Sequence, residues 1–120
     1  MISPEMIEDL FERTRQLRKE GQVAWDIDAV CRWSYFFVDS SREKLVRAGR
    51  ELEEAGYEPI GFLEPRPEHD DHETIYLRVD RVEKHTVASL LARNDSLDAM
   101  AARHGLRAYD GMDCGAVDGP

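Results

Sequence analysis

Hydrophobic and polar positions follow two different periods along this chain, and the changes of period divide it into successive elements. Between residues 3 and 21, apolar side chains from Ile7 to Leu17 recur every three or four positions. This spacing predicts an amphipathic helix. Ser3 can cap the helix and Pro4 is tolerated at its first position, so the start of the helix is marked in the sequence.

A strand rich in aromatic and β-branched residues is expected over residues 31–38. Alternation places apolar side chains on both of its faces: Trp33, Tyr35 and Phe37 on one face, and Phe36 and Val38 on the other. A strand that is apolar on both faces is expected at the centre of a sheet. We expect the stripe of Trp33, Tyr35 and Phe37 to be core beneath the N-terminal helix, although such stripes also stack bases in some small sheet proteins.

The second helix is expected from residue 40 to residue 56. Ser40 and Glu43 have the spacing of a capping box, and Gly56 can end the helix. Gly49 lies inside it and is expected to cost stability unless it lets the helix approach the sheet closely.

Two further strands are expected on either side of a polar loop at residues 66–73. The first, within residues 58–65, contains Pro59, which cannot donate to a ladder and therefore indicates a sheet edge. The second, at residues 74–82, alternates apolar and polar side chains, which predicts a half-buried strand.

A last helix and a last strand complete the pattern. Thr86 can cap a helix that ends near Gly105, although the polar run at residues 93–96 could break it into two shorter helices. The strand that follows contains Leu106 and Tyr109.

Asp110 and Gly111 interrupt this last strand with a dipeptide that is typical of tight turns. Little sequence follows for a hairpin, so we expect a sharp bend or bulge, with Gly111 at a positive φ angle. Tyr109 is expected to pack inward while its hydroxyl finds a polar partner. The Tyr109-Asp110-Gly111 motif is therefore interpreted as a locked terminal strand, with a partner-binding role as the alternative.

The order of elements, one helix and then strand-helix-strand-strand-helix-strand, predicts an α+β fold. The last six elements match the split βαβ arrangement, a ferredoxin-like α/β sandwich with an antiparallel sheet. The chain of 120 residues suits one compact domain at residues 30–117, preceded by an additional N-terminal helix and connector at residues 1–29. This helix is expected to cover part of the surface that the other helices leave open.

Charge narrows the range of partners. The formal net charge is −9, with 25 acidic against 16 basic side chains. Such a surface repels phosphate and attracts basic segments, so direct nucleic-acid binding is disfavoured and a basic protein partner is favoured. No run approaches the roughly 20 apolar residues that cross a bilayer. Cys31 and Cys114 are expected to be reduced thiols of a cytoplasmic protein.

Candidate chemistry is concentrated in the run Glu-His-Asp-Asp-His-Glu at residues 68–73. His69 and His72 are of a type that binds zinc, but they lack a metal-ligand spacing on one element, so a solvated loop is favoured over a metal site. The chain also lacks a glycine-rich phosphate loop and a nucleophile elbow. We therefore expect no catalytic residue, no metal and no cofactor.

The closing segment, LDAMAARHGLRAYDGMDCGAV, resembles the end of the regulator of ribonuclease E activity B (RraB) family, with its alanine-rich helix, glycine turn and Tyr-Asp-Gly motif. The matching positions are Ala101, Ala102, Gly105, Tyr109, Asp110 and Gly111. The segment YFFVDSSREKLVRAGRELEEAGYE resembles the family's aromatic strand and helix, so that the resemblance covers residues 30–117. Met112 departs from the family, which usually has tryptophan there.

The resemblance implies a ferredoxin-like fold and a regulator without enzymatic activity. Such a regulator binds ribonuclease E, whose noncatalytic region is disordered and arginine-rich, and thereby inhibits RNA decay. From charge, we expect the protein contact to use Glu51, Glu53 and Glu54 on the second helix and Glu68, Asp70, Asp71 and Glu73 in the polar loop. Two alternatives stay open: a metal-dependent or hydrolytic enzyme that uses the His69–His72 loop, and an interaction module with another partner. The oligomeric state is not indicated.

Overall fold

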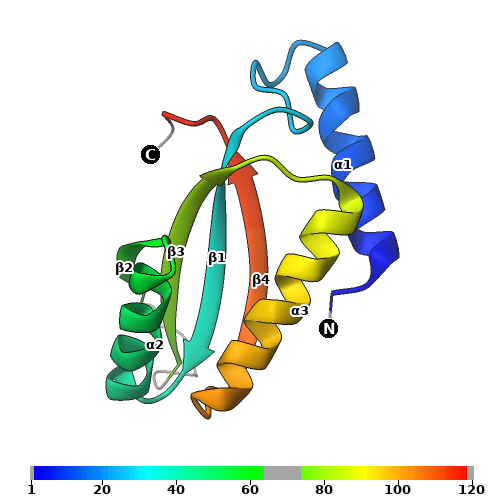
Figure 1. Cartoon of the computed structure of the whole chain (residues 1–120). Helices are drawn as coiled ribbons and strands as arrows, with labels where there is room; N and C mark the ends of the chain where they lie inside the picture. The colour runs from blue at the N-terminus through cyan, green and yellow to red at the C-terminus, as the bar shows by residue number, and fades with distance from the viewer. Residues whose placement is uncertain (1, 64–73, 119–120) are drawn as a thin grey trace.

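A computed structural model of the chain describes residues 2–63 and 74–118, and it contains three helices and four strands (Figure 1). In chain order these are α1 (Pro4–Lys19), β1 (Cys31–Asp39), α2 (Arg42–Glu54), β2 (Glu58–Leu63), β3 (Ile75–Glu83), α3 (Val87–Arg103) and β4 (Ala108–Gly115). The predicted α+β class and the predicted order of elements are confirmed. Within the described ranges, no helix is both long enough and apolar enough to cross a bilayer.

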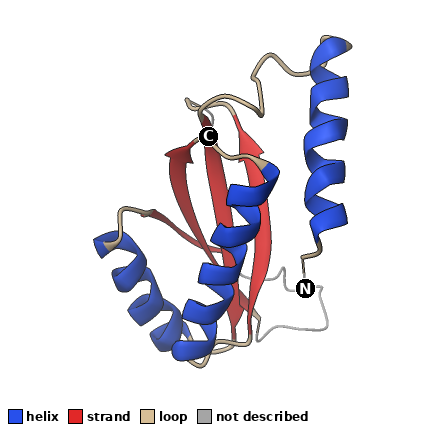
Figure 2. Ribbon diagram, turned by 45° about the vertical axis from the view of Figure 1, so that its right-hand side comes forward, coloured by secondary structure: helices blue, strands red, loops and turns tan. Residues whose placement is uncertain are grey.

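The four strands form one sheet in the order β2-β3-β1-β4, and all neighbouring strands are antiparallel. The interior position of β1 and the edge position of β2 were both predicted. Helices α2 and α3 lie against the same face of the sheet, and α1 lies beside the edge strand β4 (Figures 1 and 2). No described helix covers the opposite face, which we call the open face. α1 reaches the open face only at the β4 edge, where Met6 and Leu10 approach Phe36.

The core lies between the sheet and the helices, as the aromatic stripe of β1 predicts. Three pairs of rings form its centre: Trp33–Phe11, Tyr35–Tyr57 and Phe37–Tyr109, with ring centroids 6.1, 5.8 and 5.3 Å apart. Phe11 belongs to α1, so the N-terminal helix packs over the Trp33 end of the stripe. The rest of the stripe packs against rings from other parts of the chain.

Two local expectations are wrong. Ser41, not Ser40, caps α2, because its hydroxyl accepts the hydrogen bond from the Lys44 amide at 3.3 Å. Helix α3 also runs unbroken through residues 93–96. Its polar run does not break the helix because Asn94 is buried and hydrogen-bonded instead of competing for the backbone.

The glycine inside α2 does not mark an unusually close approach. Gly49 is buried, but a Cβ atom added there would lie 3.5 Å from Leu77 Cδ2, which is ordinary van der Waals contact. The packing of α2 on the sheet therefore leaves room for a methyl group at this position.

Candidate functional site

The Tyr-Asp-Gly motif forms a β-bulge in the edge strand β4. Phe36 of β1 lies opposite Gly111 and Phe37 lies opposite Tyr109, so Asp110 is the extra residue. Gly111 has a φ of 133°, a conformation that side chains with a Cβ rarely adopt. The predicted bulge with a positive φ angle at Gly111 is confirmed.

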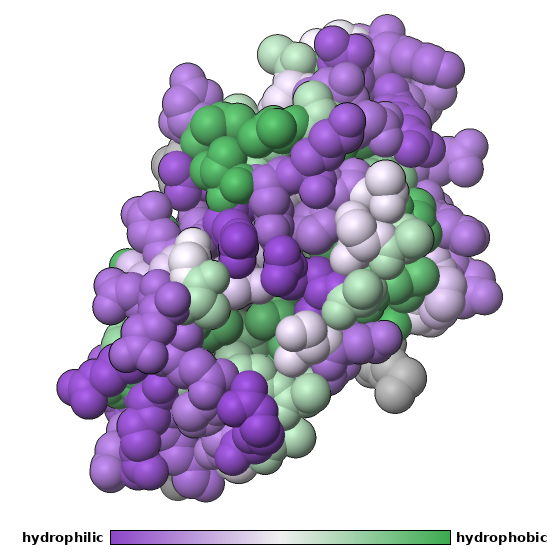
Figure 3. Space-filling model, viewed as in Figure 1, coloured by the Kyte–Doolittle hydropathy of each residue, from purple (hydrophilic) through white to green (hydrophobic). Residues whose placement is uncertain are grey.

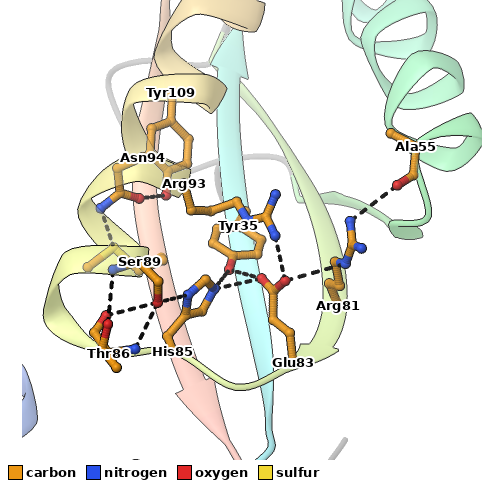
Figure 4. A network of polar contacts seen from close by, with 11 residues as sticks. Tyr35, Ala55, Arg81, Glu83, His85, Thr86, Ser89, Arg93, Asn94 and Tyr109 are labelled. Atoms are coloured by element: carbon orange, nitrogen blue, oxygen red, sulfur yellow. Dashed lines mark hydrogen bonds and ion pairs between the residues drawn. The ribbon is translucent and has the colours of Figure 1, made fainter.

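Tyr109 connects the motif to helix α3. Its ring is buried, and its hydroxyl donates a hydrogen bond to Asn94 Oδ1 at 2.5 Å (Figure 4). Burial, together with the negative charge of Asp98, raises the pKa of Tyr109, so the hydroxyl remains a neutral donor. Asn94 Nδ2 also lies 3.7 Å from Met112 Sδ. The inward packing and the polar partner were both predicted, and they give the motif a structural role.

A second buried network lies around Glu83 at the end of β3 (Figure 4). Glu83 Oε2 accepts a hydrogen bond from the Tyr35 hydroxyl at 2.5 Å and lies 2.8 Å from His85 Nε2. Glu83 Oε1 accepts a hydrogen bond from Arg93 at 2.7 Å. Burial alone would raise the pKa of Glu83, but the His85 and Tyr35 contacts and the Arg93 charge outweigh burial and lower it to about 2.

The same network contains a serine, a histidine and a glutamate that contact one another in the order found in the catalytic triads of hydrolases. His85 Nδ1 lies 2.9 Å from Ser89 Oγ, and His85 Nε2 contacts Glu83. Ser89 Oγ, however, accepts a hydrogen bond from the Thr86 amide at 2.8 Å and lies 3.2 Å from the Thr86 carbonyl. Thr86 and Ser89 together form the capping box of α3, so this hydroxyl holds the start of the helix. The start of α3 at Thr86 was predicted.

Another charged cluster lies on the open face of the sheet. Asp80, which is 1% exposed, accepts two hydrogen bonds from Arg78 at 2.9 Å and one from Arg32 at 3.2 Å. Burial would raise the pKa of Asp80, but the hydrogen bonds from Arg78, Ser34 and Arg32 lower it. The alternation of β3 predicts the face on which Asp80 lies but not its burial under two arginines from different strands.

The motif also lies at a surface hollow between α1 and β4, which we call the edge groove. Its volume is about 320 Å³, and it is lined by Ile2, Met6, Leu10, Phe36, Asp110, Gly111 and Met112. A neighbouring hollow of about 360 Å³ on the open face shares Phe36 and contains Trp25, Arg32 and Asp113. Phe36 therefore joins the groove beside α1 to a more polar hollow on the open face. The groove was not predicted from the sequence, because it depends on where α1 packs.

The predicted contact carboxylates of α2 have different environments. Glu51 pairs with Arg103 at 2.9 Å and lies 3.3 Å from His104 Nε2, which leaves it partly engaged within the molecule. Glu53 and Glu54 are exposed. The other predicted residues, Glu68, Asp70, Asp71 and Glu73, and the metal-ligand candidates His69 and His72, lie outside the described residues. No group of three or more potential metal ligands occurs in the described part of the chain.

The two cysteines, which are far apart in sequence, contact each other across β1 and β4. Cys31 is buried, Cys114 is half-buried, and both are free thiols. Burial raises the pKa of both thiols, so neither is activated as a nucleophile. Their proximity was not predicted, because it follows from the register of β1 against β4.

One protein-family model, described as regulator of ribonuclease activity B, matches residues 8–114. The match begins inside α1 and ends inside β4, and it therefore includes the Tyr109-Asp110-Gly111 bulge, the Glu83 network and most of the edge groove. It also begins earlier than the resemblance in the sequence, which starts at residue 30. No curated protein matches the chain.

Proposed function

Because the chain belongs to the RraB family of regulators of ribonuclease activity, we propose that it binds ribonuclease E and slows RNA decay through that contact. The family match over residues 8–114 is the observation that carries this proposal. The role is regulatory and not catalytic. In line with this, the Ser89 hydroxyl, which contacts His85 in the serine-histidine-glutamate arrangement, is held in the cap of α3.

The charge of the chain supports a protein partner with a basic segment. A net charge of −9 attracts an arginine-rich segment and repels the phosphates of RNA. Hydrophilic residues cover α2 and the C-terminal half of α1 on the face seen in Figure 3. A disordered basic segment can lie along such a surface without a preformed pocket for each residue.

We further propose that exposed carboxylates guide this segment to the protein. Glu53 and Glu54 on α2 are exposed, whereas Glu51 is already paired with Arg103 and contributes less. The carboxylates of Glu68, Asp70, Asp71 and Glu73 are proposed to act with them. Each exposed ion pair contributes only about 0.2–1 kcal/mol, so the effect depends on several carboxylates acting together.

We also infer that the fold behind this function is the ferredoxin-like sandwich, formed by residues 30–117 and preceded by residues 1–29. The βαββαβ order and the antiparallel sheet with α2 and α3 on one face support this inference. The two free thiols support a reducing, cytoplasmic location.

The test is an RNA-cleavage assay with purified ribonuclease E from the same source. The protein should slow cleavage by the full-length enzyme, less so as salt rises, and should leave a fragment without the basic noncatalytic region unaffected. An unrelated ribonuclease serves as a control for RNA binding, because sequestered RNA would protect against both enzymes. Unchanged cleavage by full-length ribonuclease E, together with no capture of that enzyme at low salt, would show the proposal to be wrong.

A further inference from the structure

We infer that the edge groove is the docking site for a basic partner segment that inserts an apolar side chain between α1 and β4. This inference rests on the proposed function and adds to it a place of contact and the chemistry of the occupant. The segment requires an apolar residue with arginine or lysine close to it in sequence.

The apolar part of the groove is accessible. Met6 is 56% exposed although it lies beside the buried Ile7, and Leu17, 37% exposed, continues the same stripe of α1 beyond Leu10. On the strand side, Met112 and Phe36 form the floor. Two methionines adapt their shape to an inserted side chain more readily than branched residues do, so the groove suits a segment that has no fixed structure before it binds.

The rim of the groove is acidic. Asp110 lines the groove, is exposed, and forms no ion pair with any residue within the described ranges. Asp113 is exposed in the adjoining hollow, which shares Phe36 with the groove. On α1, Asp9 lies one turn beyond Met6 and pairs with the exposed Arg13. An apolar side chain in the groove would thus bring a basic neighbour within reach of Asp110 on the strand wall, whereas Asp9 on the α1 wall is already paired with Arg13.

The bulge explains why the carboxylate is at the rim. Asp110 is the extra residue of β4, and a bulge changes the direction in which the strand presents its side chains. A Cβ atom at Gly111 would lie in ordinary van der Waals contact with Ile2 Cδ1, at 3.8 Å, so it is the positive φ angle of the bulge that requires glycine here. The motif therefore has two roles: Tyr109 fixes the strand to α3, and Asp110 faces the partner.

Charge favours a basic protein segment over two other possible occupants of the groove, a second copy of the chain and single-stranded RNA. In a symmetric contact between two copies, the acidic rims would lie close to each other, which is unfavourable. A single-stranded RNA could stack on Phe36 and Trp25 beside Arg32 and Arg78. Both arginines are, however, bonded to the buried Asp80, and the exposed Asp110 and Asp113 would repel phosphates. A basic, partly apolar protein segment satisfies both the floor and the rim.

Methionine-methyl NMR on the full chain provides a direct test. The probe is a short arginine-rich peptide with one central leucine, compared with the same peptide carrying serine in place of leucine. We expect the leucine peptide to shift the methyl signals of Met6 and Met112 but not that of Met100, which is buried in the core. The serine peptide should bind about tenfold more weakly, because it buries no apolar side chain.

Matched variants separate the groove from overall charge. Met6→Ser and Asp110→Lys should each weaken binding of the leucine peptide at least about fivefold. Val30→Ser removes a similarly exposed apolar side chain elsewhere, and Glu20→Lys makes the same change of charge at an exposed site just beyond the end of α1, away from the groove. Both controls should change the affinity by less than about twofold at physiological salt.

Four outcomes would overturn the inference: Met6 and Met112 methyl signals that stay fixed while the peptide binds, equal losses in the groove and control variants, shifts on dilution of the protein alone, or shifts with a single-stranded oligonucleotide instead of the peptide. The cleavage assay separates this failure from failure of the proposed function. If Met6→Ser and Asp110→Lys inhibit ribonuclease E as strongly as the unchanged protein, the groove is not the docking site although the function stands. If the unchanged protein does not inhibit, the function fails whatever the peptide does.

Discussion

Tyr109 and Asn94 form a buried hydrogen bond that fixes the edge strand β4 to helix α3. The tyrosine hydroxyl lies 2.5 Å from Asn94 Oδ1, and the two side chains are 7% and 3% exposed. A buried amide without a partner is costly, so this bond allows an asparagine to face the core from the middle of a helix. The polar run that predicts a helix break is therefore part of the attachment of the Tyr-Asp-Gly motif.

Replacing Tyr109 by phenylalanine should destabilise the fold by about 1–3 kcal/mol, because the ring is retained while Asn94 Oδ1 loses its donor. Urea unfolding followed by circular dichroism measures the change. Tyr76→Phe is the matched control, since Tyr76 is half-buried and makes no hydrogen bond to the described residues; its free energy of unfolding should change by less than about 0.5 kcal/mol. Equal losses in the two variants would contradict the assigned role of the Tyr109–Asn94 bond.

Gly111→Ala should destabilise the fold by roughly 1–3 kcal/mol, because a φ of 133° is strained for any residue with a Cβ atom. Gly115 in the same strand lacks a positive φ angle, and a Cβ atom added there would meet nothing within 4 Å. Gly115→Ala should accordingly leave the free energy of unfolding nearly unchanged. The melting temperatures of the two variants test this difference, and a Gly111→Ala protein as stable as Gly115→Ala would show that the bulge is not strained.

Features of the fold that depend on nearby residues could be predicted from the sequence. The alternation of Ile75, Leu77 and Val79 identifies β3, and Ser3 with Pro4 identifies the start of α1. The cap of α2 was misplaced by one residue, because adjacent serines offer the same chemistry and only the backbone conformation selects Ser41.

Features that join distant segments could not be predicted. Asp80 is bonded both by Arg78 of its own strand and by Arg32 of β1, and the contact from Arg32 depends on the register of β1 against β3. The edge groove likewise depends on the packing of α1 beside β4, and the pattern that predicts the helix does not specify its neighbour. The bulge at Asp110 was predictable because Asp-Gly is a local signal, but its position at the groove was not.

The stability of the protein should fall as the pH drops from about 4.5 to about 2. Glu83 has a folded-state pKa of about 2 against an ordinary value of 4.5, so its ionised form stabilises the fold above pH 4.5. This stabilisation is lost as the carboxylate is protonated at lower pH, and it amounts to roughly 2–3 kcal/mol near neutrality.

Glu83→Gln measures this contribution by urea unfolding at a series of pH values. The variant should be less stable than the unchanged protein at pH 7, and the difference should shrink toward pH 2. Glu51→Gln is the control, because Glu51 is exposed enough for solvent to screen its pair with Arg103, and its effect should be small at every pH. A Glu83→Gln difference that is constant with pH would mean that the Glu83 charge does not stabilise the fold.

Reversing the two exposed carboxylates of α2 together, Glu53→Lys with Glu54→Lys, should slow association with ribonuclease E and reduce its salt dependence. Both side chains are exposed, so the unfolding temperature should not change appreciably. Association rates measured by surface plasmon resonance at several salt concentrations test this, because charge steering acts mainly on the association rate.

The control for this double variant makes the same change of charge away from α2, with Glu20→Lys just after α1 and Asp118→Lys just after β4. Both of these side chains are also exposed. If the α2 carboxylates guide the partner, their reversal should slow association several-fold more than the control does. Equal slowing by both double variants would mean that the net charge of −9 attracts the partner without preference for α2. Unchanged rates and an unchanged salt response in both would exclude charge as the basis of recognition, and the apolar floor of the edge groove, with Met6 and Phe36, would then have to account for the affinity.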